Sequence, residues 1–212
     1  IDTGFDSTDV VALDLVAPTR VMAAPERAAF FDRVIARLQT MPGVASAGVV
    51  TRLPLRDGGW QGTVTIEDRP DLGEGREPNA LYRIVSPDYL AAIGVAVIDG
   101  RGFTDADAAS SLPAAIVSAS FAQQMWPARS PIGRRVHLIN RPPWREIVGV
   151  VGTVKAVFVG EDPTPQLYLP IEQNYASQMT VQVRVAGDPD GMLGNVRREL
   201  QAEWAAFQLV HL

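Results

Sequence analysis

The first third of the chain shows a strand, helix and strand pattern of apolar positions. Segment 9–18 alternates apolar and polar residues, a period of two that predicts a strand stopped by Pro18. Apolar residues then recur every three or four positions from Pro25 to Met41, which predicts an amphipathic helix. Segment 44–54 returns to a strand pattern. We therefore expect a β-α-β unit whose helix covers one face of a sheet.

The C-terminal part follows similar rules. Segment 179–187 alternates as a strand, and Asp188 and Pro189 suit the N-cap and first turn of a helix over about 189–205. The expected apolar stripe of this helix consists of Met192, Val196, Leu200, Trp204 and Phe207. The pattern in 207–212 predicts a closing strand, and hence a second β-α-β unit.

The middle of the chain, 57–145, has a different pattern of short strands separated by brief helices. The expected strands are 63–67, 80–86, 114–118 and 134–139. The expected helices are 86–93, with Ser86 as cap, and 118–126. After them, 146–155 is apolar on both faces and predicts a central strand, and 161–170 predicts a loop entering a short strand. The fold class is therefore α+β, in three parts: 1–56, an inserted subdomain 57–145, and 146–212.

Composition and charge narrow the classes of partner. The 212 residues are 47% hydrophobic and 20% charged, which is typical of a folded globular protein. The net charge is -5 and the pI is about 5.0, whereas binding to phosphate backbones relies on clustered positive charge. Two adjacent arginine pairs, Arg134-Arg135 and Arg197-Arg198, are more typical of solvated faces. We expect no nucleic-acid partner.

The sequence lacks cysteine and has no uncharged stretch long enough to cross a membrane. With no cysteine, the chain has no disulfide, thiolate metal site or cysteine nucleophile. The longest uncharged stretches, such as 89–98, are shorter than the roughly 18 to 20 residues that a membrane helix requires. Because the sequence opens on Ile1 without a Met or a signal-peptide pattern, we expect it to be a piece of a longer chain.

Segment 85–108 is the densest in candidate ligands, with four aspartates. Asp105 and Asp107 begin like a D-x-D calcium loop, but an EF-hand needs Gly at position six and Glu at position twelve. Counted from Asp105, these positions hold Ser110 and Ile116. We expect caps and turn formers here, with Thr104 as a cap and the two aspartates in a first helical turn.

No other residue pattern in the sequence predicts a catalytic, cofactor-binding or metal site. His137 and His211 stand alone in predicted strands, whereas zinc needs convergent ligands. No serine lies in a G-x-S-x-G elbow. Gly149 and Gly152 precede Lys155 without the spacing of a P-loop, and glycines in a strand often mark a bulge or a close backbone approach. We therefore expect no enzyme activity and no catalytic, cofactor-binding or metal-ligating residue.

Several stretches in order resemble one known family. They are "LQTMPGVASAGVVTRLPL", "VSPDYLAAIGVAVIDGRGFTDAD", "AAIVSASFAQQMWPARSPIGRRVHL" and "REIVGVVGTVK", followed by "PTPQLYLP" and "VRVAGDP". Together they resemble the MacB-like periplasmic core domain of ABC transporter permeases in the MacB/FtsX class. The likeness covers nearly the whole chain.

The resemblance implies an architecture and a role. It implies a porter-like part built from both chain ends and a small inserted subdomain, often called Sabre, in which 85–107 forms a helix, a short strand and turns. It implies a periplasmic or extracytoplasmic location in a protein of the inner membrane, between two membrane helices. The implied partners are a second permease subunit and a cytoplasmic ATPase that acts through the membrane part. The cargo and a periplasmic adaptor stay open.

Two alternatives from other classes remain. A free-standing extracytoplasmic ligand-binding module would need an apolar pocket, which Trp60, Trp126 and Trp144 could line. An enzyme is the weaker alternative, because the chain lacks a catalytic constellation. Membrane helices encoded on both sides of this segment would select the permease.

The sequence also predicts the backbone conformation of three glycines and the relative position of the two chain ends. Gly43, Gly94 and Gly133 stand at predicted turns or helix ends, where a positive φ favours glycine. Strands at 10–17 and 206–212 in one sheet would bring both chain ends out on the same side of the domain.

Overall fold

Strands from the two ends of the chain form one antiparallel sheet in the computed structural model, which describes residues 2–17, 22–67, 78–139 and 141–210. The strand order is β1 (Val10–Val16), β10 (Gln178–Val185) and β2 (Val44–Val50). Because β10 pairs antiparallel with both neighbours, β1 and β2 are parallel to one another. The prediction that strands from the first and last parts of the chain form one sheet is confirmed.

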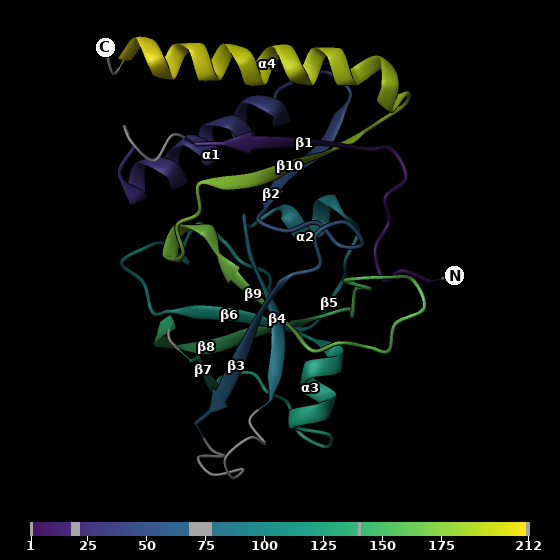
Figure 1. Ribbon diagram of the computed structural model, residues 1–212, viewed down its shortest axis with the longest axis vertical. Coiled ribbons are helices and arrows are strands. Elements are labelled where there is room, and N and C mark those ends of the chain that lie inside the picture. Colours follow the sequence, from purple (N-terminus) through teal and green to yellow (C-terminus); the bar gives the residue numbers. More distant parts are fainter. Residues whose placement is uncertain (1, 18–21, 68–77, 140, 211–212) are drawn as a thin grey trace.

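Two helices complete this part of the molecule. The helix α1 (Ala24–Gln39) packs on β2, and α4 (Pro189–Val210) packs on α1 and β1, at the top of Figure 1. The buried face of α1 contains Phe30, Phe31, Val34, Ile35 and Leu38, as its spacing predicts. We call β1, β2, β10, α1 and α4 the terminal layer.

The remaining strands close into a barrel. They are β3 (Trp60–Ile66), β4 (Asn79–Val85), β6 (Ala114–Ser118), β7 (Arg135–Leu138), β8 (Arg141–Val151) and β9 (Gln166–Pro170). Their pairing runs β4-β3-β7-β8-β6-β9, and β9 then pairs with β4 in parallel. Within the described residues, each of the six strands has a hydrogen-bonded partner on both sides, so the sheet closes on itself.

Shorter elements decorate the barrel. The strand β5 (Val97–Gly100) pairs with β8, and α3 (Ala119–Met125) packs against β6, β8 and β9. The helix α2 (Tyr89–Ala92) packs on β2, and the 3-10 helix η1 (Ile171–Gln173) leads from β9 toward β10. The segment 85–107 thus holds a helix, a short strand and turns, as the resemblance implies. The mixed α+β fold class is confirmed.

A joint formed by strand pairing connects the barrel with the terminal layer, and both parts contribute to one hydrophobic core. Val50 of β2 pairs with Val85 of β4, where β2 and β4 meet. Beside it, the Ser86 hydroxyl accepts a hydrogen bond from the Val49 amide at 3.0 Å, and the Ser86 amide donates to Val49 O at 3.1 Å. Ser86 was expected to cap a helix, but α2 begins after Asp88, so the hydroxyl serves this joint instead.

The C-terminal strand expected at 207–212 is wrong for the described residues, because α4 continues to Val210. Residues 211–212, with His211, lie outside the described residues. Without that strand the second unit is β-α only, and the two ends do not leave together. Figure 1 shows α4 ending at the top left of the molecule, and the described N-terminal residues before β1 at its right side, below the terminal layer.

The expected boundary at 145/146 falls inside β8, whose partners β5, β6 and β7 all belong to the middle of the chain. The division 1–56, 57–145 and 146–212 stays a prediction. The central position of β8 and the short strand β9 agree with the sequence pattern.

Candidate functional site

A cleft of about 490 Å³ lies between the terminal layer and the barrel. One wall is α1, which contributes Asp32, Ile35, Ala36 and Gln39. The other wall consists of Ser86, Pro87 and Asp88 before α2, and Phe103, Thr104 and Asp105 after β5. The cleft is therefore formed by residues that are far apart in the sequence.

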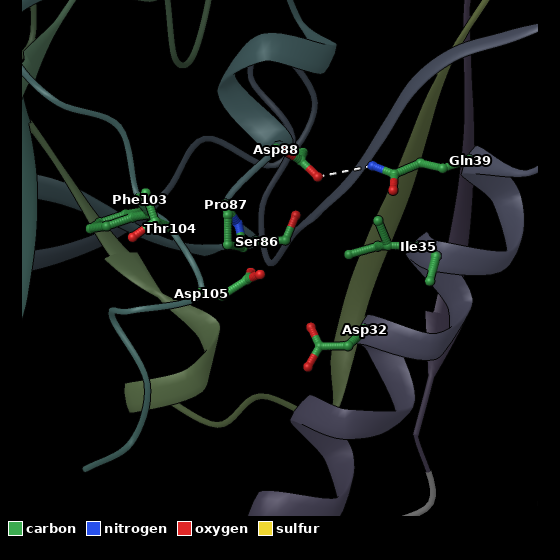
Figure 2. Close-up of a pocket in the computed structure, with 10 residues that line it drawn as sticks. Asp32, Ile35, Gln39, Ser86, Pro87, Asp88, Phe103, Thr104 and Asp105 are labelled. Atoms are coloured by element: carbon green, nitrogen blue, oxygen red, sulfur yellow. Dashed lines mark hydrogen bonds between the residues drawn. The ribbon is translucent and has the colours of Figure 1, made fainter. Parts of the chain in front are cut away.

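The two walls meet in a polar contact. Gln39 Nε2 of α1 donates a hydrogen bond to Asp88 Oδ2 at 2.9 Å, drawn as the dashed line in Figure 2. Apolar side chains of Ile35, Pro87 and Phe103 supply the dry part of the surface. The exposed Gln39–Asp88 bond is a weak tie between the walls, since water competes for both groups.

Carboxylates dominate the charge of the cleft. Figure 2 shows Asp32 and Asp105 projecting toward each other from opposite walls. The pKa of Asp32 is raised to about 7, first by partial burial and then by hydrogen bonding to Glu172 of η1 and by the charges of Glu172 and Asp105, against the opposing effect of Arg33. Asp32 as a residue keeps part of its surface in solvent, whereas its carboxyl end turns into the cleft.

The other aspartates of segment 85–108 hold the chain in shape. Arg101 Nη1 and Nη2 donate to the two oxygens of Asp107 at 2.7 and 2.9 Å, and the Thr104 amide donates to Asp107 Oδ2 at 2.9 Å. Burial alone would raise the pKa of Asp107, but Arg101 and Thr104 lower it below its ordinary value. No helix starts here, so the expectation of Thr104 as a helix cap is wrong. Asp107 closes a turn instead.

Asp99 has a similar structural role. Its Oδ2 accepts a hydrogen bond from the Ser130 hydroxyl at 2.7 Å, and its Oδ1 accepts one from the Gly100 amide at 2.8 Å. Of the four aspartates in the segment, Asp88 and Asp105 therefore face the cleft, while Asp99 and Asp107 are engaged in turns and loops.

A buried arginine anchors two loops beside the joint, and the sequence reading missed it. Arg83 of β4 donates to Gln166 Oε1 at 2.8 Å, to Arg52 O at 3.0 Å and to Gly58 O. Gln166 in turn donates to Val154 O. Arg83 thus ties the 51–59 loop, and through Gln166 the 152–165 loop, to the barrel. The alternation in β4 could not reveal this, because Arg83 occupies a position that predicts an exposed side chain.

The candidate glycines and the histidine are structural. A Cβ at Gly149 would lie 2.1 Å from Arg101 O, and the β6–β8 register shifts beside it, which confirms a bulge and a close approach. His137 of β7 stacks against Trp144 with ring centroids 5.4 Å apart. The φ angles of Gly43, Gly94 and Gly133 are 84°, 70° and 79°, so the predicted turn conformations are confirmed.

The three tryptophans of the ligand-binding alternative have separate neighbours. Trp60 packs on Tyr82, Trp126 on Phe121 and Trp144 on His137. Trp126 lines a second, more open cleft of about 350 Å³ between α3 and the loop that follows it. Neither this cleft nor the one against α1 brings the three side chains together.

The described part of the chain holds no group of three or more His, Cys, Asp or Glu side chains that could bind a metal ion. Within the same residues, none of the helices combines the length and the apolar character needed to cross a bilayer.

Comparisons with known proteins agree with the architecture. The model of the family described as "MacB-like periplasmic core domain" matches residues 3–201. The periplasmic region of MacB from Actinobacillus actinomycetemcomitans is similar in structure, with a TM-score of 0.58 and 14% identity, over 98% of this chain and 86% of that one. The extracellular domain of the ABC-type transporter YknZ from Gram-positive bacteria is similar with a TM-score of 0.54 and 17% identity, over 88% of each chain. No curated protein sequence matches.

Proposed function

Because the chain belongs to the MacB-like periplasmic core domain family, we propose that it is the non-catalytic extracytoplasmic domain of an ABC transporter permease. In this role it passes ATP-driven movement of membrane helices to export or signalling outside the membrane. The observation that carries the proposal is the family match over residues 3–201, which includes the whole barrel and the terminal layer as far as residue 201 of α4.

The architecture suits a relay of movement. Close-packed interiors resist compression. The terminal layer and the barrel each have hydrogen-bonded strands, and they share one continuous hydrophobic core. They meet at the Val50–Val85 strand pair and at Ser86 on one side, and across the cleft on the other. A displacement applied to the terminal layer would therefore be passed on to the barrel, and a shift of α1 would change the width of the cleft.

The proposed partners follow from the same role. A second permease subunit would face this domain in the intact transporter, and the ATPase would act from the cytoplasm through the membrane part. A periplasmic adaptor stays open, as does the cargo. The domain itself supplies no catalytic step in this proposal.

A free-standing extracytoplasmic ligand-binding module is the second candidate. The 490 Å³ cleft favours it, because its volume falls within the range of small-molecule sites. The two candidates differ in what the gene encodes around this segment. Membrane helices directly before and after it select the permease, and a single soluble chain selects the module.

Cross-linking across the cleft tests the relay in the full-length transporter. The 212 residues contain no cysteine, so Gln39→Cys with Asp88→Cys introduces one defined pair within them, at a contact of 2.9 Å, and any cysteine elsewhere in the transporter is replaced first. A reducible cross-linker at this pair should lower the ATPase rate of the reconstituted transporter, and reduction should restore it. The matched control is Ala12→Cys with Gln182→Cys, neighbouring positions of β1 and β10 inside the terminal layer. Equal rates for both pairs, with cross-linking complete, would contradict the relay.

A further inference from the structure

Two carboxyl groups connect the terminal layer with the segment that leaves the barrel. Asp32 lies on α1, and Glu172 lies on η1, the turn between β9 and β10. The neighbouring Gln173 ties η1 to the barrel side: its Oε1 accepts from the Ala114 amide at 2.9 Å, and its Nε2 donates to Ser111 Oγ at 2.9 Å. A change in the attraction between Asp32 and Glu172 therefore acts between α1 and an anchored segment.

Glu172 has a buried carboxyl oxygen that needs a hydrogen-bond donor. Its Oε1 is buried and has no hydrogen-bond partner within the described structure. A buried acceptor without a donor is unfavourable, because it has lost its hydrogen bonds to water. A protonated Asp32 would donate to Glu172, and this is the hydrogen bond that contributes to the raised pKa of Asp32. The pair is thus satisfied when it holds one proton.

The charges around Asp32 come from every wall that faces it. Glu172 on η1 and Asp105 on the opposite wall both disfavour an ionised Asp32, whereas Arg33 on α1 favours it. Asp88, on the same opposite wall, is bonded to Gln39. When Asp32 loses its proton, negative charges face each other across the cleft, and the attraction between Asp32 and Glu172 becomes repulsion.

We propose that the Asp32–Glu172 pair is a pH-sensitive latch that holds the cleft closed when it carries a proton and lets it open as the external pH rises. The latch deepens the proposed function and rests on it for its setting, since an extracytoplasmic domain meets the pH of the surroundings. The sign follows from proton binding. The closed cleft binds the proton more tightly than the open one, so closure is favoured at low pH and this advantage is lost as the pH rises from about 4 to about 7.

Carbon-13 NMR of the side-chain carboxyls of the 212-residue chain tests the first step. The Asp32 resonance, assigned by its loss in Asp32→Asn, should titrate at least two pH units above the ordinary aspartate value of about 3.9. In Glu172→Gln the midpoint should fall, because the repelling charge is gone. Asp162→Asn, which removes an exposed carboxylate on the 152–165 loop, should leave it unchanged. A wild-type midpoint near the ordinary value overturns the proposal.

The second step is measured as a distance. Spin labels at Ala29→Cys on the exposed side of α1 and Ser110→Cys beyond the opposite wall report the width of the cleft. We expect a longer separation at pH 8 than at pH 5. The same labels in Asp32→Asn should give the shorter separation at both values, because the amide donates to Glu172 at any pH. A separation that does not change with pH overturns the latch, whatever the Asp32 midpoint. These readings need no transporter, so the latch and the relay can fail independently.

Discussion

Arg83 donates a hydrogen bond from Nη1 to Gln166 Oε1 at 2.8 Å, and both residues are 0% exposed. The other acceptors of Arg83 are backbone oxygens of Arg52 and Gly58. A charged guanidinium is thus held in the interior by neutral oxygens, which is tolerable only while all of them stay in place. Arg83 therefore ties the 51–59 loop directly, and the 152–165 loop through Gln166, to the barrel.

Replacing Arg83 by alanine should lower the free energy of unfolding by about 3–5 kcal/mol, since the substitution leaves buried acceptors without donors and opens a cavity. Urea unfolding followed by circular dichroism measures this. Arg197→Ala, at an exposed position of α4, is the matched control and should change stability by less than about 0.5 kcal/mol. Similar losses for both variants would show that the Arg83 network is not an anchor.

The local elements could be predicted from the sequence, but their closure could not. The apolar pattern predicted most strands to within a few residues, because strands such as β1 have one face toward the core, whereas β6 and β9 are buried throughout and give apolar runs. The parallel β4–β9 pair that closes the barrel joins Leu81 with Gln166, and no local pattern encodes that register. The error at 207–212 has a physical reason: Val196, Leu200, Trp204 and Phe207 keep helical spacing, and the helix simply continues.

The cleft could not be predicted from the sequence for the same reason. Asp32 lies on a helix face that reads as solvent-exposed, and Glu172 lies 140 positions further on in a short turn. Only the fold brings them together. The aspartate-rich segment 85–108 contributes Asp88 and Asp105 to the cleft. They reach it through the turns of the segment, and the spacing of a metal-binding loop plays no part.

Gly48 is expected to be intolerant of a side chain. It lies on β2 beneath α2, and a Cβ there would lie 2.5 Å from the Tyr89 Cα. Because backbone cannot yield as a side chain does, Gly48→Ala should cost at least about 2 kcal/mol. Gly194 in α4 has open space around it, so Gly194→Ala should raise stability by up to about 1 kcal/mol through helix propensity. Thermal unfolding of both variants checks the opposite signs, and a neutral Gly48→Ala would refute the close approach.

Asp107 should contribute stability that is lost in acid. Its pKa is lowered by Arg101 and Thr104, so the ion pair is fully present above the ordinary aspartate value and is lost as the pH falls below about 4. Asp107→Asn should be less stable than the wild type at pH 7 by about 2 kcal/mol, and the difference should shrink toward pH 3. Urea midpoints across this range measure it. A constant difference would mean that the loss is steric and not ionic.

The purified chain should neither bind nor hydrolyse ATP. The sequence contains no G-x-x-x-x-G-K-S or G-x-x-x-x-G-K-T loop to hold the phosphates, and the proposed role places the ATPase in the cytoplasm. Phosphate release with magnesium and ATP should equal the buffer background. A rate that a single substitution in this chain abolishes would count against a non-catalytic domain.

The attachment of α4 should depend on one short apolar contact. Within the part of α4 whose side chains are described, Val196 and Leu200 are buried, at 0% and 7% exposure, and Glu199 pairs with Arg37 of α1 at 2.8 Å. Because an exposed ion pair adds little, the two apolar residues carry the contact. Leu200→Ala should therefore weaken the docking of α4 by about 2–3 kcal/mol. The loss should be local, since α4 lies at the outer end of the hydrophobic core that the terminal layer shares with the barrel. Hydrogen exchange followed by mass spectrometry should show faster exchange in 189–203 and unchanged protection in β6 and β8.

The control for the Leu200 variant is Gln201→Ala, one position further along on the exposed side, which should leave both regions unchanged. If Leu200→Ala instead speeds exchange equally in the barrel, the terminal layer and the barrel unfold as one unit, and a relay built from two separate bodies would lose its basis.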